Sequence, residues 1–307
     1  MKQIYDVVIA GAGPAGLSAG IYTGRALLKT LILDKGVPGG QILLTDKIEN
    51  YPGFFEAVSS FSLAEKFKSQ AVKFGCEINQ EEIKKIEREK DVWVITTSEN
   101  KYSARAVIVA TGSSHRKLDV PGESEFTGKG VSYCATCDAA FFRDKVVAVI
   151  GGGSYALTEA LFLTKFAKKV HIIHRREHLR AEKLLQKRIK ENKKINLVLN
   201  SVVTEIKGDQ KVQKANILNI KNKDKFEIKL DGIFASIGMV PNTNIVKGLV
   251  DLNEKGEVIV GKNMETSKPG IFAAGDVTDT CSNQVATAVG AGVEAGLAVN
   301  KYIEGNR

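Results

Sequence analysis

The feature that most constrains the fold is a unit that occurs twice in the chain. The apolar run Ile4–Ala10 leads into the glycine-rich segment Gly11–Gly16, and Lys145–Ile150 leads in the same way into Gly151–Ala156. Each glycine segment is followed by a stretch with the spacing of a helix and then by a second apolar run. A strand, a glycine turn, a helix and a second strand form the βαβ unit that binds dinucleotides. The repeat therefore predicts an α/β fold with two Rossmann-like units.

The first copy carries the residues that a dinucleotide site of this kind requires. Gly11 permits the tight bend, Gly13 the close approach of a pyrophosphate, and Gly16 the packing of the helix on the strand. After the next apolar run, Thr30–Leu33, the chain reaches Asp34. A carboxylate about 20 residues beyond the first glycine is placed to accept the ribose hydroxyls of an adenosine.

The second copy, which begins with Gly151 and Gly153, does not repeat this acid. The position after its second apolar run is His174, followed by Arg175 and Arg176. Arg180 is expected one helical turn further on. A guanidinium group suits a 2′-phosphate, so the cluster predicts NADPH for this unit rather than NADH or FAD. A solvated arginine cluster is the alternative.

A pair of cysteines, Cys134 and Cys137, has the spacing of a redox or a metal pair. Zinc is not expected, because a structural zinc site needs four ligands and no second pair or suitably spaced histidines accompany these two. Asp138 and an apolar run follow at once, so the pair is predicted to open a helix, where the helix dipole favours a thiolate. The adjacent carboxylate can donate or accept the proton when the dithiol opens and closes a disulfide.

The composition limits the remaining possibilities. A chain of 307 residues, 43% of them hydrophobic, is long enough for two domains, and Cys76 and Cys281 are expected to be ordinary thiols. The net charge of +9 is expected to reflect a solvated basic face, with docking of an acidic protein as the alternative and no binding of nucleic acid. No apolar run suits a signal peptide or a membrane span, so no membrane association and a cytoplasmic location are expected.

The end of the chain is too short to form a domain of its own. Residues 270–276 form a buried strand that closes on Gly-Asp, and residues 283–302 carry small and apolar residues at helical spacing. We expect them to complete the first nucleotide domain, which then consists of residues 1–113 and 246–307. The second domain, residues 114–245, is inserted between these parts and carries the cysteine pair. Pro121-Gly122 and Pro241-Asn242 are turn signals near the two crossings.

These motifs occur along the whole chain in the order found in one family, which the sequence resembles: the low-molecular-weight thioredoxin reductases. The motifs that carry the resemblance are Gly11-Ala12-Gly13-Pro14-Ala15-Gly16, Gly39-Gly40-Gln41, Asn50-Tyr51-Pro52-Gly53, Ala110-Thr111-Gly112, Cys134-Ala135-Thr136-Cys137-Asp138, Gly151-Gly152-Gly153, His174-Arg175-Arg176 and Gly275-Asp276.

The resemblance implies a set of cofactor contacts and roles. FAD is expected on Gly11, Gly13, Gly16, Asp34, Gly40, Gln41, Asn50, Gly112, Asp276 and Gln284, and NADPH on Gly151, Gly153, Arg175, Arg176 and Arg180. Cys137 is expected to face the flavin, Cys134 to attack the disulfide of thioredoxin, and Asp138 to act as general acid and base. A homodimer is also implied, as is a rotation of the inserted domain that presents the nicotinamide and the dithiol in turn.

The sequence departs from the family in two places. Ser282-Asn283-Gln284 lacks the basic residue usual before the glutamine, and Tyr155 replaces a small residue after the second glycine turn. Two further hypotheses stay open: a related reductase with another acceptor or another donor, such as NADH, ferredoxin or a deazaflavin, and a redox-sensing flavoprotein without turnover.

Overall fold

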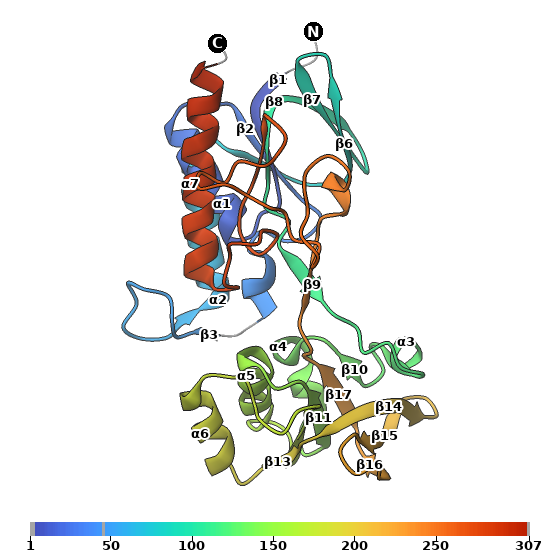
Figure 1. Ribbon diagram of the computed structural model, residues 1–307. Helices are drawn as coiled ribbons and strands as arrows, with labels where there is room; N and C mark the ends of the chain where they lie inside the picture. Colours follow the sequence, from blue (N-terminus) through green and yellow to red (C-terminus); the bar gives the residue numbers. More distant parts are fainter. Residues whose placement is uncertain (1–3, 45–46, 306–307) are drawn as a thin grey trace. The chain divides into compact units, whose positions relative to one another are not determined.

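The computed structural model describes residues 4–44 and 47–305, without the side chains of Leu44, Thr136 and Cys137. The chain divides into two compact units (Figure 1): unit 1 consists of Met1–Ser114 and Val240–Arg307, and unit 2 of His115–Met239. The predicted α/β fold, with one unit inserted into the other, is confirmed. The return to unit 1 comes earlier than the expected residue 246, because Val246 is already fully buried in a core of that unit.

Unit 1 is built on a mixed sheet with helices on one face. Its strands are β1 (Ile4–Ala10), β2 (Thr30–Asp34), β5 (Glu77–Gln80), β6 (Ile83–Glu89), β7 (Val92–Thr97), β8 (Lys101–Val109) and β19 (Ile271–Ala273). The strand order is β5-β2-β1-β8-β7-β6, and β19 pairs in parallel with β8. The helices are α1 (Pro14–Arg25), α2 (Ser60–Lys73) and α7 (Val285–Gly305). Short elements are η1 (Gly40–Leu44), β3 (Lys47–Ile48), β4 (Val58–Ser59) and η3 (Asn244–Val246).

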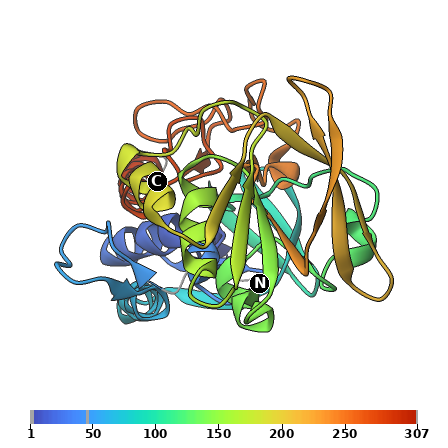
Figure 2. The same ribbon diagram turned by 90° about the horizontal axis from the view of Figure 1, so that it is seen from below.

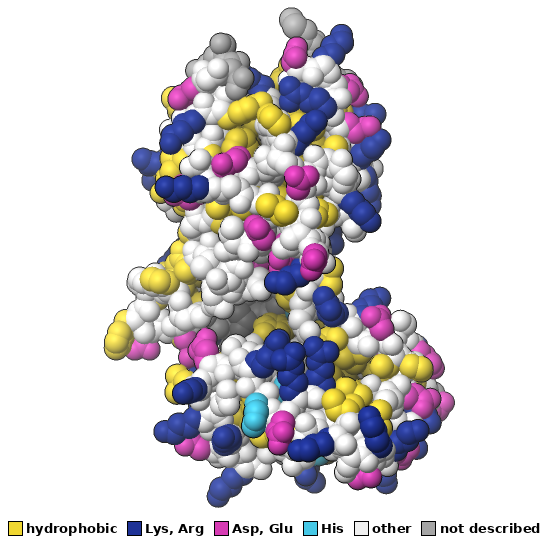
Figure 3. Space-filling view, viewed as in Figure 1, with side chains coloured by type: hydrophobic (Ala, Val, Ile, Leu, Met, Phe, Trp, Pro, Cys, Tyr) yellow, Lys and Arg dark blue, Asp and Glu magenta, His cyan; other side chains and the backbone are white. Residues whose placement is uncertain are grey.

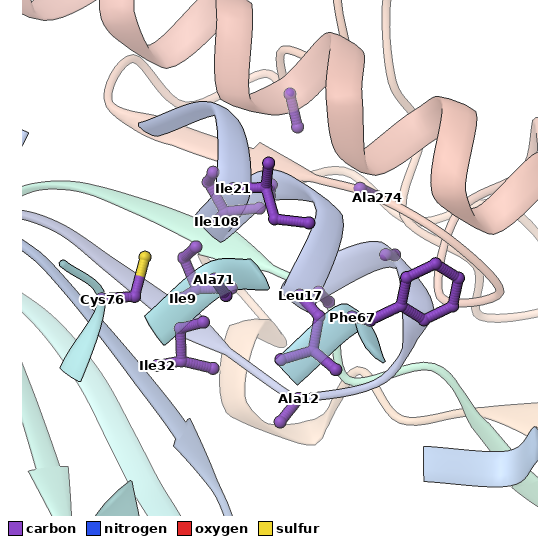
Figure 4. Packing of buried hydrophobic residues seen from close by; sticks show 14 of the residues in the cluster. Ile9, Ala12, Leu17, Ile21, Ile32, Phe67, Ala71, Cys76, Ile108 and Ala274 are labelled. Atoms are coloured by element: carbon purple, nitrogen blue, oxygen red, sulfur yellow. The ribbon is translucent and has the colours of Figure 1, made fainter. Parts of the chain in front are cut away.

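The core of unit 1 explains why its central strands are continuous apolar runs. In Figure 4, Ile9 of β1, Ile32 of β2 and Ile108 of β8 lie beside Leu17 and Ile21 of α1. Alternate residues of the same strands enter a second core on the other face of the sheet, so both faces are buried.

The C-terminal helix lies in unit 1, where α7 packs along α1 (Figure 1). A Cβ atom at Gly292 would lie 2.1 Å from the carbonyl oxygen of Ala15, and one at Gly296 would lie 2.9 Å from that of Ala19. The two helices therefore approach too closely for larger side chains at these positions. The small residues noticed in the sequence are explained by this contact.

Unit 2 has a parallel sheet with helices on one face and an antiparallel sheet on the other. The parallel strands, in the order β10-β17-β11-β12-β13, are β10 (Val131–Ser132), β17 (Gly232–Ala235), β11 (Val146–Ile150), β12 (Lys169–Ile173) and β13 (Ile195–Val198). The antiparallel strands are β14 (Ser201–Gly208), β15 (Val212–Asn219) and β16 (Lys225–Lys229). The helices are α3 (Glu123–Phe126), α4 (Ala135–Asp138), η2 (Ala139–Phe142), α5 (Ser154–Leu163) and α6 (Lys183–Glu191).

Two cores hold these layers together. One lies between the parallel sheet and α4, α5 and α6, and it contains Leu157, Leu163 and Ile172. The other lies between the parallel sheet and β14–β15, and it contains Ile206, Ile217 and Ile233. In Figure 2 the strands β14–β16 stand on the opposite side of the parallel sheet from α5.

The crossings between the units are two short segments that pair with each other, β9 (Ser113–His115) and β18 (Met239–Pro241). Asn242 ties the chain together just inside unit 1: its Nδ2 donates to the carbonyl of Thr111 at 2.9 Å, and its Oδ1 accepts from Ser114 Oγ at 2.7 Å. The expected turn at Gly122 is not at the crossing. It starts α3 inside unit 2, with a positive φ of 86°.

Candidate active site

The first glycine turn has the form expected of a phosphate-binding turn. Gly11 has a φ of 111°, and a Cβ there would lie 2.2 Å from the carbonyl oxygen of Ala110. A Cβ at Gly16 would lie 1.8 Å from the carbonyl oxygen of Gly11, so this glycine lets α1 approach the strand. At Gly13, in contrast, a Cβ would meet nothing within 4 Å. The space beside the start of α1 is therefore open where a pyrophosphate would approach.

Asp34 and Gly40 lie at this same turn. The Asp34 carboxylate accepts hydrogen bonds from the amides of Ala12, at 2.6 Å, and Gly36, at 2.8 Å. A Cβ at Gly40 would lie 3.1 Å from the Cα of Gly13. A carboxylate has about four lone-pair positions, so Asp34 can still accept from ribose hydroxyls. The structure thus brings together residues of the predicted FAD site that are distant in sequence.

Other predicted contacts of this site are paired across long sequence separations. Asn50 Nδ2 donates to Gln284 Oε1 at 3.0 Å, and Gln41 Nε2 donates to the carbonyl of Ser113. Gly112 has a φ of 63°. The Asn50–Gln284 hydrogen bond joins the first and last parts of unit 1.

Asp276 is the expected ligand with the most unusual environment. Burial raises the pKa of its carboxyl group, and its Oδ1 accepts a hydrogen bond from the thiol of Cys281 at 3.2 Å. Burial also raises the pKa of Cys281. Cys281 and Cys76 are both free thiols, as expected.

The second glycine turn repeats the geometry of the first. Gly151 has a φ of 151°, and a Cβ there would lie 2.2 Å from the carbonyl oxygen of Ser236. A Cβ at Gly153 would meet nothing within 4 Å, just before α5 begins at Ser154. A Cβ at Gly152 would lie 2.5 Å from the ring of His174. The ring of His174 therefore packs against the turn. Burial, followed by the nearby arginines, lowers the pKa of His174.

The predicted arginine cluster lies beside this turn, although one detail of the prediction is wrong. Arg180 is not one helical turn beyond Arg176, because residues 174–182 form a loop and α6 begins only at Lys183. Arg180 nevertheless returns to the turn, where its backbone amide donates to the carbonyl of Gly152 at 2.7 Å. Tertiary folding, and not helical spacing, brings it there.

The three guanidinium groups are available for an anion. Arg175, Arg176 and Arg180 are exposed, and within the described residues no carboxylate forms an ion pair with any of them. The nearby Glu177 pairs with Lys221 instead, at 3.5 Å. Figure 3 shows basic side chains gathered on the visible face of unit 2 beside a histidine.

The cysteine pair lies at the start of a helix, as predicted. Cys134 is disulfide-bonded and half-buried, and α4 begins at the next residue, Ala135. The Cys134 amide donates to Ser132 Oγ at 3.0 Å, which fixes the approach to the helix. Asp138 closes α4, and its amide donates to the carbonyl of Cys134 at 3.3 Å. The side chain of Cys137 lies outside the described part, so its role stays a prediction.

A residue that the sequence reasoning missed contacts the start of this helix. Glu159 of α5 is only 6% exposed, and its Oε1 accepts hydrogen bonds from the amide of Ala135 at 2.8 Å and from Tyr155 Oη at 3.2 Å. Its Oε2 accepts a hydrogen bond from Ser236 Oγ. A buried carboxylate is costly without such partners, so the network is a specific arrangement.

The same network explains the tyrosine that departs from the family pattern. The Tyr155 hydroxyl points to Glu159, and its ring packs on His115 with the ring centroids 5.5 Å apart. A signal for Glu159 existed in the sequence, because it falls at helical spacing between the buried Ala156 and Leu163. A single acid on the apolar face of a helix indicates a buried polar contact, but not its partner.

The fold and these sites define the class of the protein. The family model for "Pyridine nucleotide-disulphide oxidoreductase" matches residues 5–292, and the chain belongs to this family. No helix among the described residues has the length and apolar character needed to cross a membrane.

Particular relatives are similar over nearly the whole chain. The thioredoxin reductase of Listeria monocytogenes is 43% identical over 304 residues, which cover 99% of this chain and 95% of the relative. That of Treponema pallidum is 44% identical, with 99% of both chains covered. The crystal structure of Lactococcus lactis thioredoxin reductase in its FR conformation has a TM-score of 0.95 and 43% identity, and it covers 98% of this chain and 99% of its own.

Proposed function

We propose that this protein is an NADPH-dependent thioredoxin reductase that passes electrons through bound FAD to the Cys134–Cys137 pair. The observation that carries the proposal is the disulfide at Cys134. This cysteine directly precedes a short helix, in the unit that also holds a glycine turn of the dinucleotide-binding type with exposed arginines. The names and coverage of the relatives support the same function.

The residues of unit 1 fit FAD. Gly13 leaves open space beside the start of α1, while Asp34 and Gly40 lie at the same turn. We assign the pyrophosphate to this turn and the ribose hydroxyls of the adenosine to Asp34. Gln41, Asn50, Gly112, Asp276 and Gln284 are proposed to line the rest of the site. The bound flavin would supply a carrier that accepts a hydride and passes on two electrons.

The residues of unit 2 fit NADPH. Gly153 offers the same open approach at the start of α5, and Arg175, Arg176 and Arg180 supply cationic groups that are not engaged by carboxylates in the described residues. The 2′-phosphate is the group that would distinguish NADPH from NADH at such a cluster.

The cysteines would carry out thiol–disulfide exchange. With the disulfide reduced, the Cys134 thiolate attacks one sulfur of the thioredoxin disulfide, and the other sulfur of that disulfide leaves as a thiolate. Cys137 then attacks the mixed disulfide, which restores the Cys134–Cys137 bond and leaves thioredoxin as a dithiol. Two electrons have moved to thioredoxin. Asp138 is proposed to give the proton that a leaving thiolate requires and to take it back.

The remaining proposals concern the oligomeric state, the location and the domain motion of the enzyme. We propose that it acts as a homodimer in the cytoplasm, and that unit 2 rotates relative to unit 1 between two working positions. The two short paired crossings, β9 and β18, are the segments that such a rotation would use. The size of the dimer can be measured by light scattering.

An anaerobic titration tests the proposed donor and cofactor together. The purified yellow protein is titrated with NADPH and, separately, with NADH, while the flavin absorbance near 450 nm is followed. Bleaching by NADPH at much lower concentration than by NADH supports the proposal, and turnover with thioredoxin then identifies the acceptor. If neither nucleotide bleaches the flavin, the donor is another carrier, such as ferredoxin or a deazaflavin.

A further inference from the structure

The carboxyl group of Glu159 is buried in unit 2, and the proposed function gives it no role. It lies on α5, which is not part of the cysteine helix. Its Oε1 is 2.8 Å from the amide nitrogen of Ala135, and that nitrogen is bonded to the carbonyl carbon of Cys134. One hydrogen bond therefore connects the interior of the nucleotide-binding unit to the first turn of the redox helix.

We propose that Glu159 is a positioning residue for the redox pair. Glu159 fixes the start of α4, and its negative charge disfavours the thiolate of Cys134. The proposal rests on the proposed function only in taking Cys134 as a redox-active sulfur. Glu159 contacts this segment through the hydrogen bond from the Ala135 amide, so we infer that its effect on the Cys134 sulfur passes through that amide and through space.

The chemistry of the pair makes such a charge important. Two electrons, supplied by the nicotinamide cofactor, break the sulfur–sulfur bond and leave two thiolates, which take up two protons if both end as thiols. A carboxylate hydrogen-bonded to the amide that follows Cys134 favours the protonated sulfur there, because two nearby negative charges repel each other. Where Glu159 is ionised, its charge therefore favours the thiol over the thiolate at Cys134 in the reduced pair.

The environment of Glu159 acts on the ionisation of its carboxyl group in two opposite directions. Burial raises the pKa of the carboxyl group, whereas the hydrogen bonds from Ser236, Ala135 and Tyr155 act in the opposite direction. Glu159 and Cys134 are therefore expected to titrate as a coupled pair, in which ionisation of either group opposes that of the other.

Other titratable groups of the described residues lie on the elements around Glu159. Cys134 directly precedes α4, Asp138 ends it, and α5 itself carries Tyr155, whose pKa burial raises far above neutrality. His174 lies under the glycine turn that precedes α5, and burial lowers its pKa. The core beside α5 includes the apolar side chains of Val149 in β11, Ile172 in β12 and Ile189 in α6.

Beyond Tyr155 lies His115, whose ring packs on the tyrosine ring. Burial lowers its pKa as well. Both histidines are thus held towards their neutral forms, so neither supplies a cation that would cancel a negative charge on Glu159 around neutral pH.

The test measures the ionisation of Cys134 directly. FAD-loaded protein carrying Cys137→Ser is kept reduced, and the rate at which iodoacetamide alkylates Cys134 is followed between pH 5 and pH 9 by mass spectrometry of its peptide. The measurement requires neither NADPH nor thioredoxin. Three variants are compared in this background: Glu159→Gln, Ser236→Ala and, as the matched control, Glu81→Gln.

Glu159→Gln keeps an oxygen that can accept from the Ala135 amide but removes the charge. We expect the midpoint of the alkylation profile to fall by about one pH unit, which is a tenfold rise in the thiolate fraction at low pH. A less basic thiolate reacts more slowly, so the net rate below the midpoint should rise about threefold. Ser236→Ala removes a donor that stabilises the carboxylate and should move the midpoint in the same direction by less.

Glu81→Gln is the control because Glu81 is also a buried carboxylate, with hydrogen bonds from Thr97, Asn100 and Tyr102, but lies in unit 1. A profile for Glu159→Gln that coincides with that of the control would overturn the proposal. If Glu159→Gln does not fold, the Ser236→Ala variant tests the proposal instead. An alkylation midpoint of Ser236→Ala that equals that of the control would also overturn the proposal.

Failure of this inference is distinguishable from failure of the proposed function. A protein that does not reduce thioredoxin can still show the shifted midpoint, in which case the inference stands and the acceptor is wrong. Wild-type protein that reduces thioredoxin, with Glu159→Gln leaving the profile unchanged, removes the inference alone.

Discussion

Replacing Gly13 by alanine separates the stability of the first glycine turn from its ability to bind a nucleotide. Gly13 has φ −75° and ψ −176°, which an alanine adopts without strain, and its Cβ would meet no atom within 4 Å. Alanine reduces the freedom of the unfolded chain, which stabilises by about 0.4–1 kcal/mol, but it is a poorer residue than glycine before a helix. The two effects oppose each other, so the free energy of unfolding without FAD should change by less than about 1 kcal/mol.

The effect on FAD should be much larger. The new methyl group occupies the open space that we assign to the pyrophosphate, and overpacking of this kind costs about 1–3 kcal/mol. The dissociation constant for FAD should therefore rise roughly fivefold to 150-fold. Gly16→Ala should behave differently, because its Cβ would lie 1.8 Å from a backbone oxygen; it should destabilise the protein itself, by about 3 kcal/mol or more.

The assay has two parts. Thermal or urea unfolding of the FAD-free protein gives the stability, and quenching of flavin fluorescence on titration gives the affinity. Gly290→Ala is the matched control, since Gly290 also has open space around its Cβ position but lies on α7, outside the proposed site. Gly13→Ala protein that binds FAD as tightly as the wild type would refute the assignment of the pyrophosphate to this turn.

Three further outcomes are expected. Cys134→Ser and Cys137→Ser should each abolish thioredoxin reduction while the protein stays yellow, and activity retained in either variant, measured by NADPH oxidation with thioredoxin, would contradict the dithiol route. The double change of Arg175 and Arg176 to glutamine should raise the KM for NADPH about tenfold and should leave the KM for NADH nearly unchanged. Tenfold corresponds to the low end of the free energy of a charge-assisted hydrogen bond, which we expect because both groups are exposed. Equal effects in steady-state kinetics with the two nucleotides would show that the cluster does not bind the 2′-phosphate. Burial raises the pKa of Cys76 to about 11, so its alkylation should be slow at pH 8 and should rise about tenfold per pH unit up to that pKa; a plateau near pH 9 by peptide mass spectrometry would contradict this.

The elements predicted most accurately are those whose signal is local. Strand β1 has the predicted bounds, because it is a run of apolar residues that ends at a glycine turn. The last strand is shorter than predicted, Ile271–Ala273, since Gly275 and Asp276 leave the sheet to form a turn. Helix α7 begins at Val285, slightly later than predicted.

The candidate site could be predicted only in part. The glycines and Asp34 could be predicted as a candidate site because a dinucleotide site requires particular residues at fixed spacing along one βαβ unit. Arg180 was identified for the wrong reason, since it reaches the turn through a loop and not through a helix. Glu159 was missed, because its partners Ala135 and Ser236 are distant in the sequence.

The sequence by itself determined the α/β class, the two dinucleotide-binding units, the insertion of one into the other and the redox pair. Each of these depends on a local pattern of apolar residues, glycines or cysteines, which is visible without knowledge of contacts. Only the tertiary structure decided that the chain returns to unit 1 before Val246, that Asn50 meets Gln284, and that Glu159 lies under the cysteine helix. These contacts arise when segments far apart in the chain pack against each other, because burial selects partners for polar groups that local spacing does not specify.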